Sequence, residues 1–374
     1  CTYLFIFYCN KMLMFGWILI NLINNLLHGK SMVGNIEPSE LGRTLTHEHL
    51  SMNFEHFYRK PPEQLRDCFQ DKPTLETIGF VRQYPYSSKY NLKLDDTDAK
   101  EAVLHDVFAY RKYGGGAIVE NTSNGLDRDI KFYEELSNAT GVHIIAGTGH
   151  YIEDLQSDNC LHYSTEDIYN QMLTELTVGF AEKPDSQAGF MGEIASVWPI
   201  RDFERKAIRA AGELQPQIGC GVSFHPHRHP EAPFEIIRLY LEAGGSADKV
   251  VMSHLDRTLL EDEILLEFAQ LGTYCQFDLF GVEVSYYQLN VATDMMSDAQ
   301  RIKKIDLLVK EGFENRILIS HDIHTKHRLI DFGGHGYSHI LNNVLPKMKS
   351  KGFTKETIDK ITIENPATWL SIKN

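Results

Sequence analysis

The sequence lacks the cysteine patterns that stabilise small secreted domains or bind structural zinc. Its six cysteines are scattered over 374 residues, and no two of them form a C-x-x-C pair. This spacing excludes a disulfide framework and a cysteine-based zinc finger, and it indicates reduced thiols in a reducing compartment. We therefore expect a cytoplasmic protein.

A surplus of basic residues is also missing. The chain has 37 lysines and arginines against 51 aspartates and glutamates, which gives a formal net charge of −14. That balance argues against nucleic acids and anionic membranes as partners, because both are bound through basic surfaces. Hydrophobic residues make up 43% of the chain and charged residues 24%, as in soluble globular proteins.

Long hydrophobic runs are confined to the N-terminus. Residues 1–27 are mostly apolar, and Lys11 is their only formal charge. The run is similar to the core of a signal peptide or membrane anchor, but several asparagines interrupt it and no small-x-small cleavage site follows. We interpret residues 1–31 as an extension outside the fold, with a signal or anchor as the alternative. Residues 32–374 are then a single domain.

Beyond the N-terminus, short apolar segments alternate with helical ones. Strands are expected at residues 44–47, 117–121, 142–146, 190–194, 221–225, 249–254, 274–278 and 316–322. Helices are expected at residues 98–113, 130–140, 165–180, 202–217, 233–243, 262–271 and 299–311. No G-x-G-x-x-G follows a strand, which disfavours a dinucleotide-binding fold. The pattern predicts an α/β protein, specifically a (β/α)8 TIM barrel with insertions.

Side chains that bind metals recur at the ends of these strands. His47 and His49 form an H-x-H pair on one face of an extended segment, because alternate side chains point the same way. Later strands end on Glu193, His225, His254 and Asp322. A single histidine at a strand end is usually structural. An ordered series at the catalytic end of one barrel instead predicts a two-metal hydrolase site.

Several neighbours of these residues leave alternatives open. His321 and Asp322 should point to opposite faces, and we favour Asp322 because a carboxylate can bind a metal, hold a water molecule and accept its proton. Asp256 is a candidate for orienting His254. Arg257 is either a clamp for an anionic substrate group or half of a surface ion pair. The aromatic segment 54–91 is either a pocket wall or a plain surface insertion.

Five motifs resemble the phosphotriesterase-related branch of the phosphotriesterase family, in the amidohydrolase superfamily. They are LGRTLTHEHL (41–50), GGGAIVENT (114–122), MSHLDRT (252–258), HDIHTK (321–326) and GGHGYSHIL (333–341). The resemblance runs from about Val33 to the C-terminus. It implies a TIM barrel with two divalent metal ions, usually zinc, although manganese, iron and cobalt suit the same ligands.

The resemblance also implies roles for the individual residues. His47, His49 and Asp322 would hold the more buried metal, His225 and His254 would hold the other, and Glu193 would bridge them. Glu193 stands where phosphotriesterases proper carry a carboxylated lysine, so phosphotriester chemistry does not carry over directly. Asp322 would take the proton of the attacking water, with His254 passing it on.

The expected activity follows the same branch. Its animal members are associated with amide hydrolysis of small anionic N-acyl amino-acid-like compounds, such as N-acetyltaurine. A lactonase, an ester hydrolase or a phosphotriester hydrolase of the same fold is the alternative. A binding barrel without catalysis is a more remote one. The expected partners are a small-molecule substrate and a second copy of the chain in a homodimer.

Overall fold

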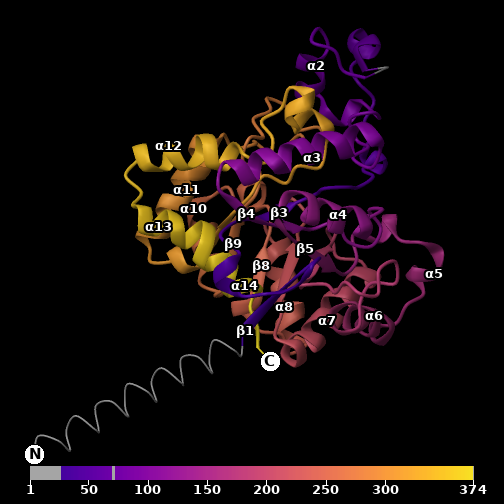
Figure 1. Ribbon diagram of the computed structural model, residues 1–374, viewed down its shortest axis with the longest axis vertical. Coiled ribbons are helices and arrows are strands. Elements are labelled where there is room, and N and C mark those ends of the chain that lie inside the picture. The colour runs from indigo at the N-terminus through magenta and orange to yellow at the C-terminus, as the bar shows by residue number, and fades with distance from the viewer. Residues whose placement is uncertain (1–26, 70–71, 374) are drawn as a thin grey trace, which may run out of the picture.

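The computed structural model describes residues 27–69 and 72–373 (Figure 1). Its centre is an eight-stranded sheet in the order β10-β9-β8-β7-β6-β5-β4-β3, with every neighbouring pair parallel. The strands are β3 (Arg43–Glu48), β4 (Gly115–Glu120), β5 (His143–Thr148), β6 (Phe190–Ala195), β7 (Gly221–His225), β8 (Val250–Met252), β9 (Tyr274–Phe277) and β10 (Ile317–Ile319). Spatial order follows chain order, as in a TIM barrel.

The first and last strands of this sheet meet and close the barrel. Asp322 N donates to His47 O at 3.1 Å, and His47 N donates to Ser320 Oγ at 3.0 Å. Thr46 Oγ1 donates to Ile319 O at 3.3 Å. The predicted (β/α)8 barrel is therefore confirmed.

Helices surround the strands (Figure 1). Those that were expected are α3 (Thr97–Lys112), α4 (Ile130–Thr140), α6 (Thr165–Thr177), α7 (Asp202–Ile218), α8 (Ala232–Glu242), α10 (Asp262–Ala269) and α11 (Asp298–Lys310). Others were not predicted: α2 (Ile78–Gln83), α5 (Asp158–Leu161), α9 (Leu255–Thr258), α12 (Leu345–Ser350), α13 (Lys355–Asp359) and α14 (Asn365–Leu370). They are short, and short helices depend on tertiary packing more than on their own sequence.

The barrel interior is filled with side chains at the end where the strands begin. Trp369 of α14 is fully buried there, its ring 5.4 Å from that of Phe190, and its Nε1 donates to Lys249 O at 3.1 Å. Gly221 allows this approach, because a Cβ at that position would lie 2.3 Å from the indole nitrogen. A site for small molecules is therefore confined to the opposite end.

The predicted domain boundary at residue 32 is wrong. Leu27–Ser31 forms strand β1, which pairs antiparallel with β2 (Gly34–Ile36) and with β11 (Ile372–Lys373). The partner strand lies at the far end of the chain, so no local pattern indicated the pairing. The apolar run over residues 1–26 lies outside the described residues. Within the described part, no helix is both long and apolar enough to cross a bilayer.

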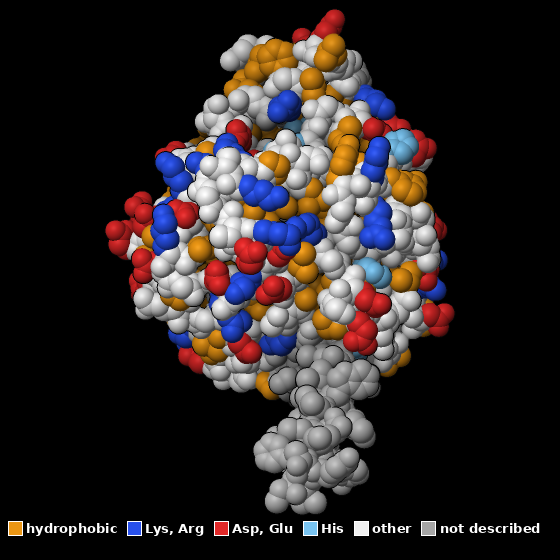
Figure 2. Space-filling view, turned by 60° about the vertical axis from the view of Figure 1, so that its left-hand side comes forward, with side chains coloured by type: hydrophobic (Ala, Val, Ile, Leu, Met, Phe, Trp, Pro, Cys, Tyr) orange, Lys and Arg blue, Asp and Glu red, His pale blue; other side chains and the backbone are white. Residues whose placement is uncertain are grey.

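Acidic and basic side chains are interspersed over the face shown in Figure 2. The described part of that face therefore presents both charge signs rather than one continuous patch of either. Such mixing is ordinary for a protein surface and does not by itself indicate a binding function.

A buried carboxyl group ties α3 to the C-terminal loops. Asp106 is 1% exposed, and its Oδ2 accepts a hydrogen bond from Ile330 N at 3.1 Å. Burial raises the pKa of Asp106 to about 7, although the bond from Ile330 opposes the shift. The folded chain therefore keeps this proton to higher pH than the unfolded chain does. As pH rises from the ordinary aspartate pKa to about 7, ionisation of Asp106 lowers the free energy of unfolding.

Replacing Asp106 with asparagine should remove this pH dependence, since the amide has no proton to release. Between about pH 5 and about pH 8, the wild type should lose about 2–3 kcal/mol of unfolding free energy relative to Asp106→Asn. Urea titrations of both proteins at the two pH values measure this difference. Parallel pH profiles would contradict the prediction.

Candidate metal centre

The six predicted ligands come together at the carboxyl ends of the barrel strands. All are buried, and they are His47, His49, Glu193, His225, His254 and Asp322. His254 and Asp322 follow β8 and β10, which end earlier than expected, because both residues adopt a left-handed backbone with φ of 58° and 55°. Histidine and aspartate tolerate this conformation better than most residues, and it turns the chain out of the sheet at the site.

Two overlapping groups of these side chains have the spacing of a metal site. One consists of His47, His49 and Asp322, the other of His47, Glu193 and His254, and within each group the ligand atoms lie within 4.8 Å of one another. His49 Nε2 is 3.2 Å from Asp322 Oδ1, and His47 Nε2 is 3.4 Å from Glu193 Oε2. These distances leave room for an ion shared by the donors.

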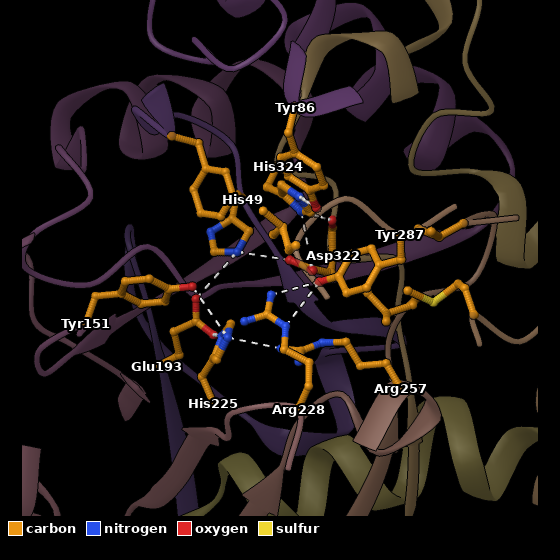
Figure 3. A pocket seen from close by; sticks show the side chains of 15 residues that line it. His49, Tyr86, Tyr151, Glu193, His225, Arg228, Arg257, Tyr287, Asp322 and His324 are labelled. Atoms are coloured by element: carbon orange, nitrogen blue, oxygen red, sulfur yellow. Dashed lines mark hydrogen bonds and ion pairs between the residues drawn. The ribbon is translucent and has the colours of Figure 1, made fainter. Parts of the chain in front are cut away.

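His225 joins the second group through one ring nitrogen. Its Nδ1 lies 2.8 Å from Glu193 Oε2 and 3.0 Å from His254 Nε2. Figure 3 shows Glu193 and His225 pointing into the same space as His49 and Asp322. The structure therefore brings together every ligand that the sequence predicted.

The donor atoms fit divalent metal ions. His47 Nε2 is buried without a hydrogen-bond partner among the described residues, while its Nδ1 is held by Ser253 Oγ at 3.1 Å. A buried polar atom without a partner is costly, and a metal ion would satisfy it. Imidazole nitrogens with carboxylate oxygens suit zinc, manganese, iron and cobalt.

The protonation states of the site also suit a cation. Burial lowers the pKa of His47 and of His254 to about 4, so both imidazoles are neutral and have a free lone pair at neutral pH. Burial works against ionisation of Asp322, but His324 and His49 outweigh it and hold the pKa of that carboxyl well below its usual range.

The pKa of His49 also reflects the negative charge of the carboxylates at this centre. Burial opposes its protonation, yet the hydrogen bond to Asp322 and the charge of Glu193 outweigh burial and raise the pKa of His49 to about 9. The centre is therefore built to hold positive charge.

Asp278, at the end of β9, orients His254. Its Oδ1 lies 2.7 Å from His254 Nδ1, and both carboxylate oxygens accept from His254 N at 3.1 Å. This arrangement turns His254 Nε2 toward Glu193. The prediction of Asp256 for this role is wrong, because Asp256 accepts from Arg301 Nε at 2.7 Å and from Leu279 N at 3.0 Å.

His321 points away from the centre, and Asp322 points into it. His321 Nδ1 lies 2.7 Å from Glu48 Oε1, and its Nε2 accepts from Ile340 N at 3.0 Å. Glu48, the middle residue of the H-x-H motif, also accepts from His321 N at 2.9 Å and from Ile323 N at 3.0 Å. It thus fastens the loop after β10 to the end of β3.

A cavity opens above the ligands, with about 470 Å³ of empty space that is partly open to solvent. Its walls include the aromatic side chains of Phe54, Tyr86, Tyr151 and Tyr287 (Figure 3). Phe54 and Tyr86 belong to the segment 54–91, so part of that segment contributes to the pocket wall. His227 and His229 lie outside this cavity, and His229 stacks on Trp198 with ring centroids 4.9 Å apart.

Two arginines line the same cavity. Arg257 is 3% exposed, its Nη2 lies 3.1 Å from His225 Nε2, and its Nη1 has no hydrogen-bond partner. No carboxylate among the described residues pairs with it, so the surface ion-pair interpretation is wrong. Arg228, which sequence reasoning missed, donates through Nη2 to Tyr287 Oη at 2.7 Å. The only sequence signal for its role was its position in the loop just after β7, two residues beyond Pro226.

Comparisons with known proteins show which family the chain belongs to. The profile of the Phosphotriesterase family matches residues 29–370. The phosphotriesterase-related protein of Aedes aegypti is 54% identical over 342 residues, covering 90% of this chain and 96% of that protein. The one of Drosophila erecta is 53% identical over 343 residues, covering 91% and 98%.

Solved structures show the same fold. A resiniferatoxin-binding protein from Rhodobacter sphaeroides superposes with a TM-score of 0.86 at 25% identity, covering 92% of this chain and 94% of that one. The phosphotriesterase homology protein from Escherichia coli gives 0.71 at 24% identity, covering 88% and 99%. With its metal-competent centre at the catalytic end of the barrel, the chain belongs to the phosphotriesterase family of metal-dependent hydrolases.

Proposed function

We propose that this protein hydrolyses the amide bond of small anionic N-acyl compounds, with N-acetyltaurine as the first candidate. The observation that carries the proposal is Arg257. This guanidinium is buried beside the ligand His225, has no carboxylate partner and leaves Nη1 unsatisfied. A sulfonate or carboxylate on the substrate supplies a negatively charged acceptor, which a neutral ester or lactone lacks.

The proposed ligand sets are those that the family resemblance implies, and the grouping of these side chains supports them. His47, His49 and Asp322 would hold one ion, His225 and His254 the other, and Glu193 would bridge both. We propose zinc, and manganese, iron or cobalt remain alternatives with the same ligand preferences. When bound, the two ions lower the pKa of a water molecule and polarise the substrate carbonyl.

The chain's own residues move the proton and hold the substrate. Asp322 is ionised and has one oxygen beside His49, so it can accept the proton of the attacking water. Its other oxygen lies 3.3 Å from His324 Nδ1, and His324 Nε2 lies 3.1 Å from Tyr86 Oη. These contacts make His324 the nearer relay, while the predicted catalytic role of His254 stays a prediction.

Two arginines and the aromatic walls account for substrate selection. Arg257 would bind the anionic group directly, and Arg228 adds positive charge on the same side of the cavity. We expect the aromatic side chains that line the cavity to restrict the acyl group to a small one. Together they favour a short N-acyl chain with an anionic tail.

Metal content and hydrolysis, measured together on the full chain, test this proposal. We expect close to two ions per chain, acetate release from N-acetyltaurine, and loss of both after chelation with recovery on adding zinc. Two ions without amide cleavage would redirect the search to lactones and phosphotriesters, the alternative activities. A protein that binds no metal would refute the proposed mechanism.

The homodimer and the cytoplasmic location also stay predictions.

Arg257→Gln should raise KM for N-acetyltaurine about 10- to 100-fold, because a charge-assisted hydrogen bond is lost. Its KM for a neutral ester should stay near the wild-type value. Arg238→Gln is the matched control, since Arg238 pairs with Glu235 on the exposed face of α8. An unchanged KM for the anionic amide would remove Arg257 from the substrate site.

A further inference from the structure

We propose that anion binding at Arg257 and metal binding at His225 are coupled through the two nitrogens of the His225 ring. This inference rests on the proposed function, because it needs a metal ion held by His225. It adds a property that the ligand set alone does not imply: the enzyme acquires its full affinity for an anionic substrate only when the second metal is in place.

The coupling begins with the hydrogen bonds of His225. Its Nδ1 lies 2.8 Å from Glu193 Oε2, and its Nε2 lies 3.1 Å from Arg257 Nη2. A neutral imidazole has one N–H and one lone pair, and arginine can only donate. In the metal-free protein, Nδ1–H therefore donates to Glu193, and the lone pair of Nε2 accepts from Arg257.

A metal ion at Nδ1 reverses this arrangement. His225 would hold the ion through its Nδ1 lone pair, so the single proton of the ring would reside on Nε2 and the imidazole would stay neutral throughout. Tyr151 Oη, 3.4 Å from Nε2, can accept that proton in a hydrogen bond. Arg257 Nη2 now faces an N–H instead of a lone pair, and it loses its acceptor.

Arg257 is then left with two unsatisfied terminal nitrogens. Nη1 already has no partner, and the described residues offer no carboxylate to replace His225. Unsatisfied buried donors of a charged group are costly, so an anion in the cavity gains affinity by accepting from both nitrogens. By thermodynamic linkage, the anion must strengthen metal binding by the same factor.

Arg228 provides an internal comparison. It lines the same cavity and carries the same charge, but its guanidinium already donates to Tyr287 Oη at 2.7 and 3.2 Å. No hydrogen bond joins it to a metal ligand in the described part of the chain. A purely electrostatic effect of the metal would act on both arginines, whereas the proposed exchange acts on Arg257 alone.

The test uses the full chain, zinc and ethanesulfonate, an anion that has no bond to hydrolyse. Zinc affinity is measured by competition with a chromogenic chelator, with and without ethanesulfonate. We expect the anion to tighten the weaker zinc site about tenfold or more in the wild type and in Arg228→Gln. In Arg257→Gln the side-chain carbonyl can accept from His225 Nε2–H, so tight zinc binding should no longer need the anion.

Each outcome decides the proposal. Loss of the anion effect in Arg257→Gln, with the effect kept in Arg228→Gln, supports it; Arg257→Met gives the same reading if the glutamine variant does not fold. An effect that persists in Arg257→Gln would mean that the anion contacts the metal directly, and it would overturn the coupling. Two zinc ions with no anion effect in the wild type would overturn the coupling and leave the hydrolase intact. Fewer than two zinc ions would overturn both.

Discussion

Replacing Asp322 with asparagine is expected to lower kcat for the preferred substrate about 10³-fold while the barrel stays folded. Asp322 Oδ1 lies 3.2 Å from His49 Nε2 and 3.7 Å from His47 Nε2, at the centre of the first ligand group. Its pKa is held well below the usual range, so the side chain is an ionised carboxylate at neutral pH. Asparagine fills the same space but has no charge and accepts no proton from water.

Initial rates at saturating substrate, together with zinc content and circular dichroism, separate catalysis from folding. Asp331→Asn is the matched control, because Asp331 pairs with His105 on the surface, with 2.8 Å between the two atoms. The control should retain wild-type rates. A kcat for Asp322→Asn within tenfold of the wild type would contradict the role of Asp322 as proton acceptor.

Replacing Asp278 with asparagine should weaken the metal site that includes His254 about 10- to 100-fold. Asp278 is fully buried, and its carboxylate fixes both the ring and the backbone of His254. The neutral amide holds the ring less firmly and makes its other nitrogen a poorer metal ligand. Chelator competition measures the loss directly.

The comparison with Asp256→Asn makes this prediction specific. Asp256 is equally buried but belongs to an ion pair with Arg301, 2.7 Å away. Its replacement should destabilise the fold by about 1–3 kcal/mol, since Arg301 loses one of its two carboxylate partners and keeps only Asp298, 3.0 Å away, while zinc affinity stays near wild type. A matching loss of zinc affinity in Asp256→Asn would return the orienting role to Asp256.

The contrast between Asp256 and Asp278 shows where sequence reasoning stops. The clustering of the six candidate ligands could be predicted, because a buried parallel strand is recognisable locally and its last residue faces the catalytic end of the barrel. The orienting residue could not be assigned from proximity in the chain. Asp278 reaches His254 because β8 and β9 are neighbours in the sheet, a relation between residues 24 positions apart.

The places of the two arginines in the cavity and the first strand of the fold could not be predicted from the sequence for a similar reason. Arg257 looked like either a clamp or a surface residue, and only tertiary packing buries it beside His225 without an acid. Arg228 follows a proline in a loop, where no periodicity indicates direction. Likewise, β1 becomes a strand through residues 372–373, which lie at the other end of the chain.

Glu48 joins the end of β3 to the loop after β10, so the centre can form only after both segments have been synthesised. Glu48 sits between His47 and His49 and takes its donors from residues 320–323. During synthesis, an amino-terminal histidine pair emerges early, but its carboxylate partner leaves the ribosome only after most of the 374 residues. Growing chains fold from the N-terminus onward. His47, His49 and Asp322 therefore come together only after β10 has packed beside β3, and a chain that ends before residue 320 cannot assemble this group.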